Sequence, residues 1–305
     1  MRILHLDAGN EMRGGQWQVL RLIDGLAVYG VESTLLARPG ACLYDAARRK
    51  SRRVEPLSFA RAVLLARNHD LVHAHDARAH TLGAIIAGAP LVVSRRVAFG
   101  FGEAGLRPAL PGRWKYARPA HYMAVSEHVK SVLIERGVPP QRITVVYDGV
   151  PLLEPGQAAG LPHILALANA NDPQKGAPLA LEAARLAGLD LHLTSDLEAD
   201  LRRASAFVYI TRSEGLGSAV LLAMSAAVPV IASRMGGLLE VIRHGETGLL
   251  VENDAYAIAA AMRELLAKPA WARQLGAAAR RAVAEHFTVD HMVRRTMEIY
   301  QKVLS

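Results

Sequence analysis

The chain has 305 residues, of which 51% are apolar and 21% charged, a composition typical of globular proteins with room for two domains. Its one cysteine, Cys42, excludes an intramolecular disulfide and suits a reducing compartment. Asp7 interrupts the amino terminus too early for a signal peptide, and Ser225 and Pro229 interrupt the longest apolar run, 218–233, which argues against a membrane-spanning helix.

Short apolar runs alternate with longer helical patterns along the first half of the chain. A helical face over 15–30 ends at a glycine, and further helical patterns begin at Thr81 and Glu127. The βαβα order predicts a parallel, doubly wound sheet. Its six candidate strands are 2–8, 31–38, 70–75, 90–96, 121–126 and 142–150.

The segment 151–162 is rich in proline and glycine, which predicts a linker. A second alternating series follows it, and the end of the chain, from 254 to 305, has a helical pattern. The predicted fold class is α/β, with Rossmann-like doubly wound domains at 1–150 and 163–285 facing a central cleft. The strands expected in the second domain are 163–169, 189–195, 206–212, 228–233 and 248–252.

The positive charge lies in the first half. Residues 1–155 carry 21 Lys and Arg against 13 Asp and Glu, whereas the remaining residues carry 15 of each, so the net charge of +8 belongs to the first half. Such a patch can face nucleic acid, a phosphorylated acceptor or anionic lipid, and a solvated helix end is an equal alternative. Few aromatic residues accompany it, which argues against nucleic acid. The densest part, here called the basic cluster, comprises Arg48, Arg49, Lys50, Arg52 and Arg53.

A Ser-Glu-Gly-Leu-Gly-Ser turn at 213–218 follows a predicted strand and opens an apolar helix. Glycines let the backbone approach a ligand, and the free N–H groups at a helix start attract an anion such as a diphosphate. A carboxylate at Glu214 would repel that anion, so we expect it to face sugar hydroxyls. The turn alone favours the alternative, an ordinary helix cap with an acid near the helix dipole.

A wider pattern continues from this turn to residue 251. The block resembles the donor-binding half of retaining glycosyltransferases of family 4, which have the GT-B fold. Gly14-Gly15 before a helix resembles the first glycine loop of that family, and the tail resembles its last helix, so we expect 286–305 to pack back on the first domain. The block contains Glu214-Gly-x-Gly, Ala223-Met224, Pro229-Val-Ile-Ala-Ser, Gly236-Gly237-Leu, Glu240-Val-Ile and Gly245-x-Thr-Gly-Leu-Leu-Val.

The resemblance implies transfer of a sugar from a nucleotide-diphosphate sugar to a hydroxyl of a glycan or lipid-linked acceptor, with retention of configuration. It implies no cofactor and no metal, because a lysine and helix N-termini neutralise the diphosphate. With the basic first domain, it implies a cytoplasmic protein of bacterial cell-surface polysaccharide or lipopolysaccharide synthesis, in peripheral contact with the anionic inner membrane. No nucleic acid partner is expected.

The resemblance also assigns roles to residues. Glu214 matches the first acid of the E-x7-E motif, which contacts the donor sugar, and Lys175 matches the cation that binds the donor diphosphate. These two are the predicted catalytic residues. Gly14 and Gly15 match the loop over the donor. The remaining donor-binding candidates are Gly215, Leu216, Gly217, Ser218 and Ala219.

The chain departs from the family at four places. Leu222 stands where the second acid of E-x7-E belongs, and Asn169-Ala170-Asn171 stands where a diphosphate-binding arginine is usual. The stretch 175–214 is short by about one strand–helix step, and Ser94-Arg95-Arg96 replaces a common histidine. An inactive scaffold in glycan assembly is therefore the alternative, and a GT-B epimerase is less favoured. Arg95, Arg96 and Arg212 are the candidates to replace the missing arginine.

His73, His75 and His80 suggest a metal site, because His-x-His on a strand places two rings on one face. No cysteine or clear third ligand accompanies them, so we favour a strand end that lines the cleft. The candidate acceptor or sugar contacts are His75, Asp76, Arg95 and Arg96.

Overall fold

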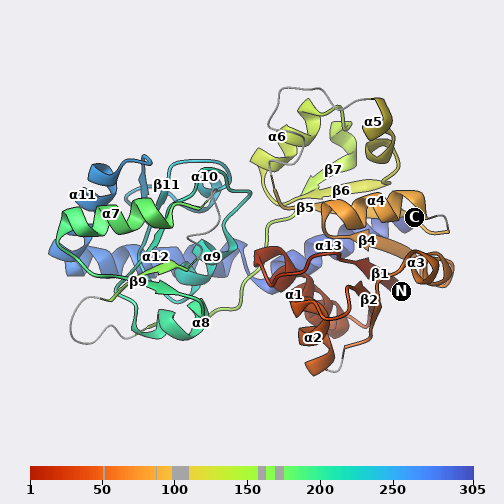
Figure 1. Ribbon diagram of the computed structural model, residues 1–305, viewed down its shortest axis with the longest axis horizontal. Helices are drawn as coiled ribbons and strands as arrows, with labels where there is room; N and C mark the ends of the chain where they lie inside the picture. Colours follow the sequence, from red (N-terminus) through yellow and green to blue (C-terminus); the bar gives the residue numbers. More distant parts are fainter. Residues whose placement is uncertain (51, 87, 98–109, 157–162, 169–174) are drawn as a thin grey trace. The chain divides into compact units, whose positions relative to one another are not determined.

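A computed structural model describes residues 1–50, 52–86, 88–97, 110–156, 163–168 and 175–305. The chain divides into two compact units, unit 1 (Met1–Gly149 and Val289–Ser305) and unit 2 (Val150–Thr288). Each unit consists of a parallel sheet with helices packed on it (Figure 1). The predicted α/β class with two doubly wound sheets is confirmed.

The sheet of unit 1 has seven strands in the order β3-β2-β1-β4-β5-β6-β7, every neighbouring pair parallel. The order reverses between β1 and β4, which makes the carboxyl ends of these two strands the expected ligand site. One strand, β3, lies outside the six that the sequence predicts. The strands are β1 (Arg2–Leu6), β2 (Glu32–Ala37), β3 (Val54–Pro56), β4 (Leu71–Ala74), β5 (Leu91–Arg95), β6 (His121–Ala124) and β7 (Ile143–Val145).

Two helices from opposite ends of the chain cover one face of this sheet. Leu22 of α1 and Tyr300 of α13 are buried with Ile3 and Leu71 of the sheet in one core cluster. Gly25 lets α1 and α13 approach closely, because a Cβ there would lie 2.4 Å from Val293 Cγ2. The helices of unit 1 are α1 (Gly14–Val28), α2 (Cys42–Arg49), α3 (Phe59–Ala66), α4 (Ala77–Ile85), α5 (Leu110–Ala117), α6 (Glu127–Glu135) and α13 (Val289–Leu304).

The sheet of unit 2 has five strands in the order β12-β11-β10-β8-β9, all parallel. The order reverses between β8 and β10. Within the described residues the sheet ends at β9 on one side and at β12 on the other, and the end at β9 accords with the short stretch between Lys175 and Glu214. The strands are β8 (Ile164–Leu167), β9 (Leu191–Thr194), β10 (Ala206–Tyr209), β11 (Val230–Ser233) and β12 (Leu249–Val251).

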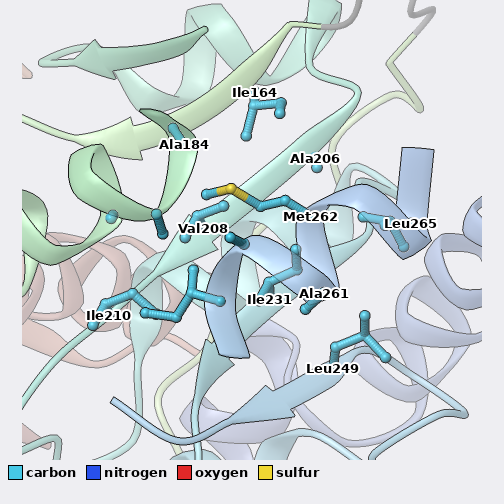
Figure 2. Close-up of a cluster of buried hydrophobic side chains, with 14 of the residues drawn as sticks. Ile164, Ala184, Ala206, Val208, Ile210, Ile231, Leu249, Ala261, Met262 and Leu265 are labelled. Carbon is cyan, nitrogen blue, oxygen red and sulfur yellow. The ribbon is translucent and has the colours of Figure 1, made fainter. Parts of the chain in front are cut away.

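One core cluster of unit 2 lies between a face of this sheet and the adjacent helices α7 and α11 (Figure 2). Val208 and Ile231 of the sheet meet Ala184 of α7 and Met262 of α11 in this cluster. The helices of unit 2 are α7 (Ala177–Ala187), α8 (Leu197–Asp200), α9 (Ser218–Ser225), α10 (Leu238–Val241), α11 (Ala255–Ala267) and α12 (Pro269–His286).

The predicted helical end of the chain, 254–305, is divided into α11, α12 and α13. Proline is favoured in the first turn of a helix but not in a helix interior, so Pro269 starts α12. Between α12 and α13, Phe287 O accepts the Val150 N–H (2.9 Å). The chain passes from one unit to the other after residue 149 and again after residue 288, and this hydrogen bond joins the two segments of unit 2 that lead to those points. In the part of the chain that the structure describes, every helix is too short or too polar to cross a bilayer.

Candidate functional site

Lys175 and Glu214 lie at the point where the strand order of unit 2 reverses. Lys175 follows β8 and Glu214 follows β10, so both lie at carboxyl ends of adjacent strands. The two loops are joined by backbone contacts: Lys175 forms a bridge with Thr211, and the Gly176 N–H donates to Ile210 O at 2.8 Å. The sheet thereby fixes the positions of residues that are 39 apart in the sequence.

The side chains of Lys175, Tyr209 and Glu214, here called the Lys175 cluster, are joined to one another by hydrogen bonds. The Lys175 ammonium donates to Glu214 Oε2 at 2.7 Å and to the Tyr209 hydroxyl at 2.6 Å. The Tyr209 hydroxyl in turn donates to Glu214 Oε2. The Lys175 and Glu214 side chains are 21% and 15% exposed, so ligands can reach a pair that is largely shielded from water.

Sequence reasoning selects Lys175 and Glu214 but does not select Tyr209. Tyr209 is the last residue of β10, where Val208 faces the core cluster and period-2 alternation turns Tyr209 to the other face. A phenol in an otherwise apolar strand, at its carboxyl end, is the signal that could identify it.

A glycine pair supports the turn that carries Glu214. The Gly237 N–H donates to Glu214 O at 3.2 Å, and a Cβ on Gly237 would lie 2.0 Å from Gly215 O. Gly217, with φ +100°, is the N-cap of α9, where only glycine adopts such a backbone without strain. Leu216 is buried between these glycines. The packing of this turn therefore requires glycine at Gly217 and Gly237.

The first residues of α9, Ser218 and Ala219, are partly exposed, whereas Leu222 is buried at 8% exposure. Leu222, which stands where the family has its second acid, is thus packed with the apolar side chains of unit 2. The segment Asn169–Asn171, where an arginine is usual, lies outside the described residues.

In unit 1, Asp76 follows β4 and its carboxylate is used by the fold. Its Oδ1 accepts the N–H groups of Arg78 (2.7 Å) and Ala79 (3.0 Å), which caps α4, and its Oδ2 accepts the N–H of Ala8. Asp76 therefore joins the ends of β1 and β4, and an acceptor would have to share oxygens that are already hydrogen-bonded.

Asp7 follows β1 and is buried, with 1% exposure. It accepts the Gly9 N–H at 2.9 Å and the Gln16 side-chain amide at 3.2 Å, and so holds the loop that leads to Gly14 and Gly15 at the start of α1. Burial, followed by the charge of Asp76, raises the pKa of the Asp7 carboxyl from 3.8 to about 6.

We expect Asp7→Asn to stabilise the protein increasingly as the pH rises. A carboxyl whose pKa is raised on folding makes the folded state less stable as the pH increases from its unfolded pKa of 3.8 to about 6. The advantage of the variant in the free energy of unfolding should grow by ~2 kcal/mol between about pH 4.5 and about pH 7.5. Urea denaturation of both proteins at the two pH values measures this growth. A packing effect of the substitution that is independent of pH cancels in the difference between the two pH values. An advantage that stays constant or shrinks would contradict the burial of this charge.

Arg96 and Arg95 have different surroundings. Arg96 Nε lies 3.2 Å from Asp148 Oδ1, its guanidinium reaches His75 Nδ1 at 3.5 Å, and a Cβ on Gly15 would lie 3.7 Å from Arg96 Cδ. Arg96 therefore lies beside the glycine loop. Arg95 is buried, and burial lowers the pKa of its guanidinium.

His73 and His75 lie on the same face of β4 and its end, as the His-x-His spacing predicts, and His5 of β1 joins them. Burial lowers the pKa of all three imidazoles, that of His5 to about 3, so they are neutral. His80 is separate: it lies on α4 and bonds to Lys115 O at 2.9 Å. Sequence reasoning missed His5, because only strand pairing brings it to His73.

The hydrogen bonds of these three histidines argue against a metal ion among them. Arginine can only donate, so His75 Nδ1 accepts from Arg96 and His75 Nε2–H donates to His5 Nδ1 at 3.0 Å. His73 uses both of its nitrogens, on Tyr300 Oη (2.6 Å) and Ser94 Oγ (2.8 Å). A metal would have to displace these bonds next to the positive charge of Arg96, although the ring nitrogens are close enough together to bind one.

Two family models match the chain, one in each unit. Residues 12–152 match Glycosyltransferase Family 4, and residues 175–268 match Glycosyl transferases group 1. The chain therefore has the GT-B fold and carries domains of two glycosyltransferase families, a family 4 domain in unit 1 and a group 1 domain in unit 2.

Curated relatives match parts of the chain. An alpha-maltose-1-phosphate synthase of Mycolicibacterium smegmatis is 41% identical over 110 residues, which are 34% of this chain and 28% of that protein. The protein of the same name in Mycobacterium tuberculosis is 30% identical over 207 residues, 60% of this chain and 54% of that one. The chain thus spans about half, or less, of the length of these relatives.

A solved structure matches the whole fold. The crystal structure of Anabaena HepE in complex with UDP and glucose has a TM-score of 0.85 and 16% identity, with coverage of 99% of this chain and 100% of that chain. At this identity the match establishes the fold.

Proposed function

We propose that this protein is a metal-independent retaining glycosyltransferase that uses a nucleotide-diphosphate sugar. The observation that carries the proposal is the Lys175 cluster beside the glycine turn of unit 2, at the reversal of strand order and inside the segment matched to group 1. A cation and a carboxylate at this position suit a ligand that has both phosphates and hydroxyls.

Each group has a physical role in this proposal. Negative charge on the leaving diphosphate grows as the glycosidic bond breaks, and a fixed ammonium at Lys175 stabilises it. The backbone N–H groups at the start of α9 point toward the same anion. Glu214 accepts hydrogen bonds from the sugar hydroxyls, for which Oε1 retains acceptor capacity beside the Gly215 N–H at 3.2 Å.

Of the two arginines of unit 1 predicted to contact the acceptor or sugar, Arg96 is the better candidate. Its neighbours, Asp148 and His75, orient the guanidinium beside Gly15 of the glycine loop. Arg95 is buried on its own strand. Arg212, the third candidate, is exposed just before Glu214 in unit 2.

The acceptor in this proposal is a glycan or lipid-linked saccharide of the bacterial cell surface, used at the cytoplasmic face of the inner membrane. The basic cluster supports it only in part. Lys50 and Arg52 are paired with Asp24 of α1, at 3.2 and 2.7 Å, whereas Arg48 and Arg49 end α2 exposed. With Arg53, which is exposed as well, these two arginines are the cations of the cluster that an anionic surface would meet.

Calorimetry with UDP, GDP and ADP tests the proposal. UDP is the first choice because the similar HepE structure contains it. Binding of at least one nucleotide, followed by sugar transfer from the matching nucleotide sugar, is the expected result. Failure of all three to bind at about millimolar concentration, a free energy of about −4 kcal/mol, would reject the proposal.

The alternative function is a glycosyltransferase-like scaffold without catalysis. Two observations favour it: Leu222 cannot accept a hydrogen bond from a ribose, and the sheet of unit 2 ends at β9 within the described residues. Both concern the nucleoside, and neither affects the Lys175 cluster.

A further inference from the structure

In the absence of a ligand, the two charges of the Lys175 cluster neutralise each other. The Lys175 ammonium uses two of its three N–H groups on Tyr209 and Glu214. Within the described residues, Glu214 Oε2 accepts only from Lys175 and Tyr209, and Oε1 accepts only from the Gly215 N–H. A diphosphate that recruits the ammonium must therefore compete with the carboxylate.

Withdrawal of the ammonium would leave the Glu214 carboxylate poorly solvated, since its side chain is only 15% exposed. Removing a partner from such a charge is costly, because the lost hydrogen bond is not replaced by water. The Tyr209 hydroxyl donates to the same oxygen independently of Lys175. As a neutral donor, it can remain on the carboxylate without a change of charge.

The position of Tyr209 is well defined. The residue is 6% exposed, and its ring centroid lies 5.0 Å from the Lys175 ammonium. The same ammonium is 2.6 Å from the hydroxyl oxygen, so it lies near the ring plane beside the hydroxyl, and the hydrogen bond is the contact that holds it. Tyr209 therefore contacts both members of the ion pair and has little freedom of its own.

We propose that Tyr209 is a positioning residue for diphosphate binding: its hydroxyl stays on the Glu214 carboxylate and so releases the Lys175 ammonium to the phosphates. This rests on the proposed function, because it assigns the diphosphate to Lys175. It adds a residue that the sequence pattern does not single out.

A double-mutant cycle tests the proposal by calorimetry with inorganic pyrophosphate. Tyr209→Phe should weaken binding about tenfold, because departure of the ammonium then leaves Glu214 Oε2 without a donor. In a Glu214→Gln background the same change should alter the pyrophosphate affinity less than about twofold, since a neutral amide does not need a donor in place of the ammonium. Tyr256→Phe, which removes the hydroxyl of a 71% exposed tyrosine in unit 2, is the control for loss of a phenol.

Three results would overturn the role of Tyr209. They are unchanged pyrophosphate affinity in Tyr209→Phe, an equal loss in both backgrounds, and no binding of pyrophosphate by the unsubstituted protein. The outcome for the function is separate. If the protein binds pyrophosphate and the double-mutant cycle gives the expected result, but UDP, GDP and ADP do not bind, the role of Tyr209 is supported and the proposed function is rejected. Thermal melting of each variant confirms that it is folded.

Discussion

Lys175→Ala should lower sugar transfer ~100- to 1000-fold in kcat/KM, the usual effect of removing one fixed group that stabilises charge in a transition state. The ammonium lies 2.7 Å from Glu214 and is the one side-chain cation bonded to this carboxylate among the described residues. Lys175→Arg should retain more activity than Lys175→Ala, because it keeps the charge. Initial rates with the nucleotide sugar identified by calorimetry measure the effect.

Lys268→Ala is the matched control for this loss. Lys268 also pairs with a glutamate at 2.7 Å, Glu264, but this pair is 57% and 48% exposed at the end of α11. An exposed pair contributes little, so this variant should retain both stability and transfer. Transfer by Lys175→Ala within about threefold of the unsubstituted protein would show that the diphosphate is neutralised elsewhere.

Local patterns were sufficient to predict most of the fold. Alternation of apolar runs with helical faces is a property of neighbouring residues, so the parallel sheets followed from it. The strand that was missed, Val54–Pro56, has only three residues and follows the basic cluster, so no apolar run marks it. It forms because β2 offers a parallel partner, Leu35 opposite Val54, which is a tertiary effect.

Residues brought together by strand pairing could not be predicted from the sequence in the same way. His5 pairs in register with His73, and no spacing along the chain indicates it. Likewise, the resemblance assigns Lys175 and Glu214 to the same ligand, but only the structure shows that they bond to each other and to Tyr209. Long-range register is what sequence patterns omit.

The predicted contacts in unit 1 illustrate a further limit, which is that a polar residue at a strand end can serve the fold. Asp76 was selected for its position, yet its oxygens cap α4 and hold the Ala8 N–H. His75 was selected for the same reason, and both of its nitrogens are hydrogen-bonded. Both remain predicted contacts, whose free hydrogen-bonding capacity is now known to be small.

Gly237→Ala should reduce both stability and transfer, because the added Cβ would overlap backbone. It would lie 2.0 Å from Gly215 O and 2.8 Å from Leu216 Cα, so the turn that carries Glu214 must move by roughly 1 Å. Overpacking of this kind costs ~1–3 kcal/mol, and a displacement of about 1 Å at a reacting centre can lower a rate ~100-fold. Thermal melting and transfer rates measure the two effects.

Gly276→Ala separates these effects, because it creates the same overlap away from the predicted site. A Cβ on Gly276 of α12 would lie 2.0 Å from Ala227 O, again a backbone atom. This variant should lose a similar ~1–3 kcal/mol of stability and, assayed well below its melting temperature, keep transfer within a few-fold of normal. Equal losses of transfer in the two variants would mean that Gly237 acts through stability alone. A loss confined to Gly237→Ala would place the turn around Glu214 in the catalytic step, since both substitutions create a 2.0 Å overlap with backbone and only one of them is at this turn.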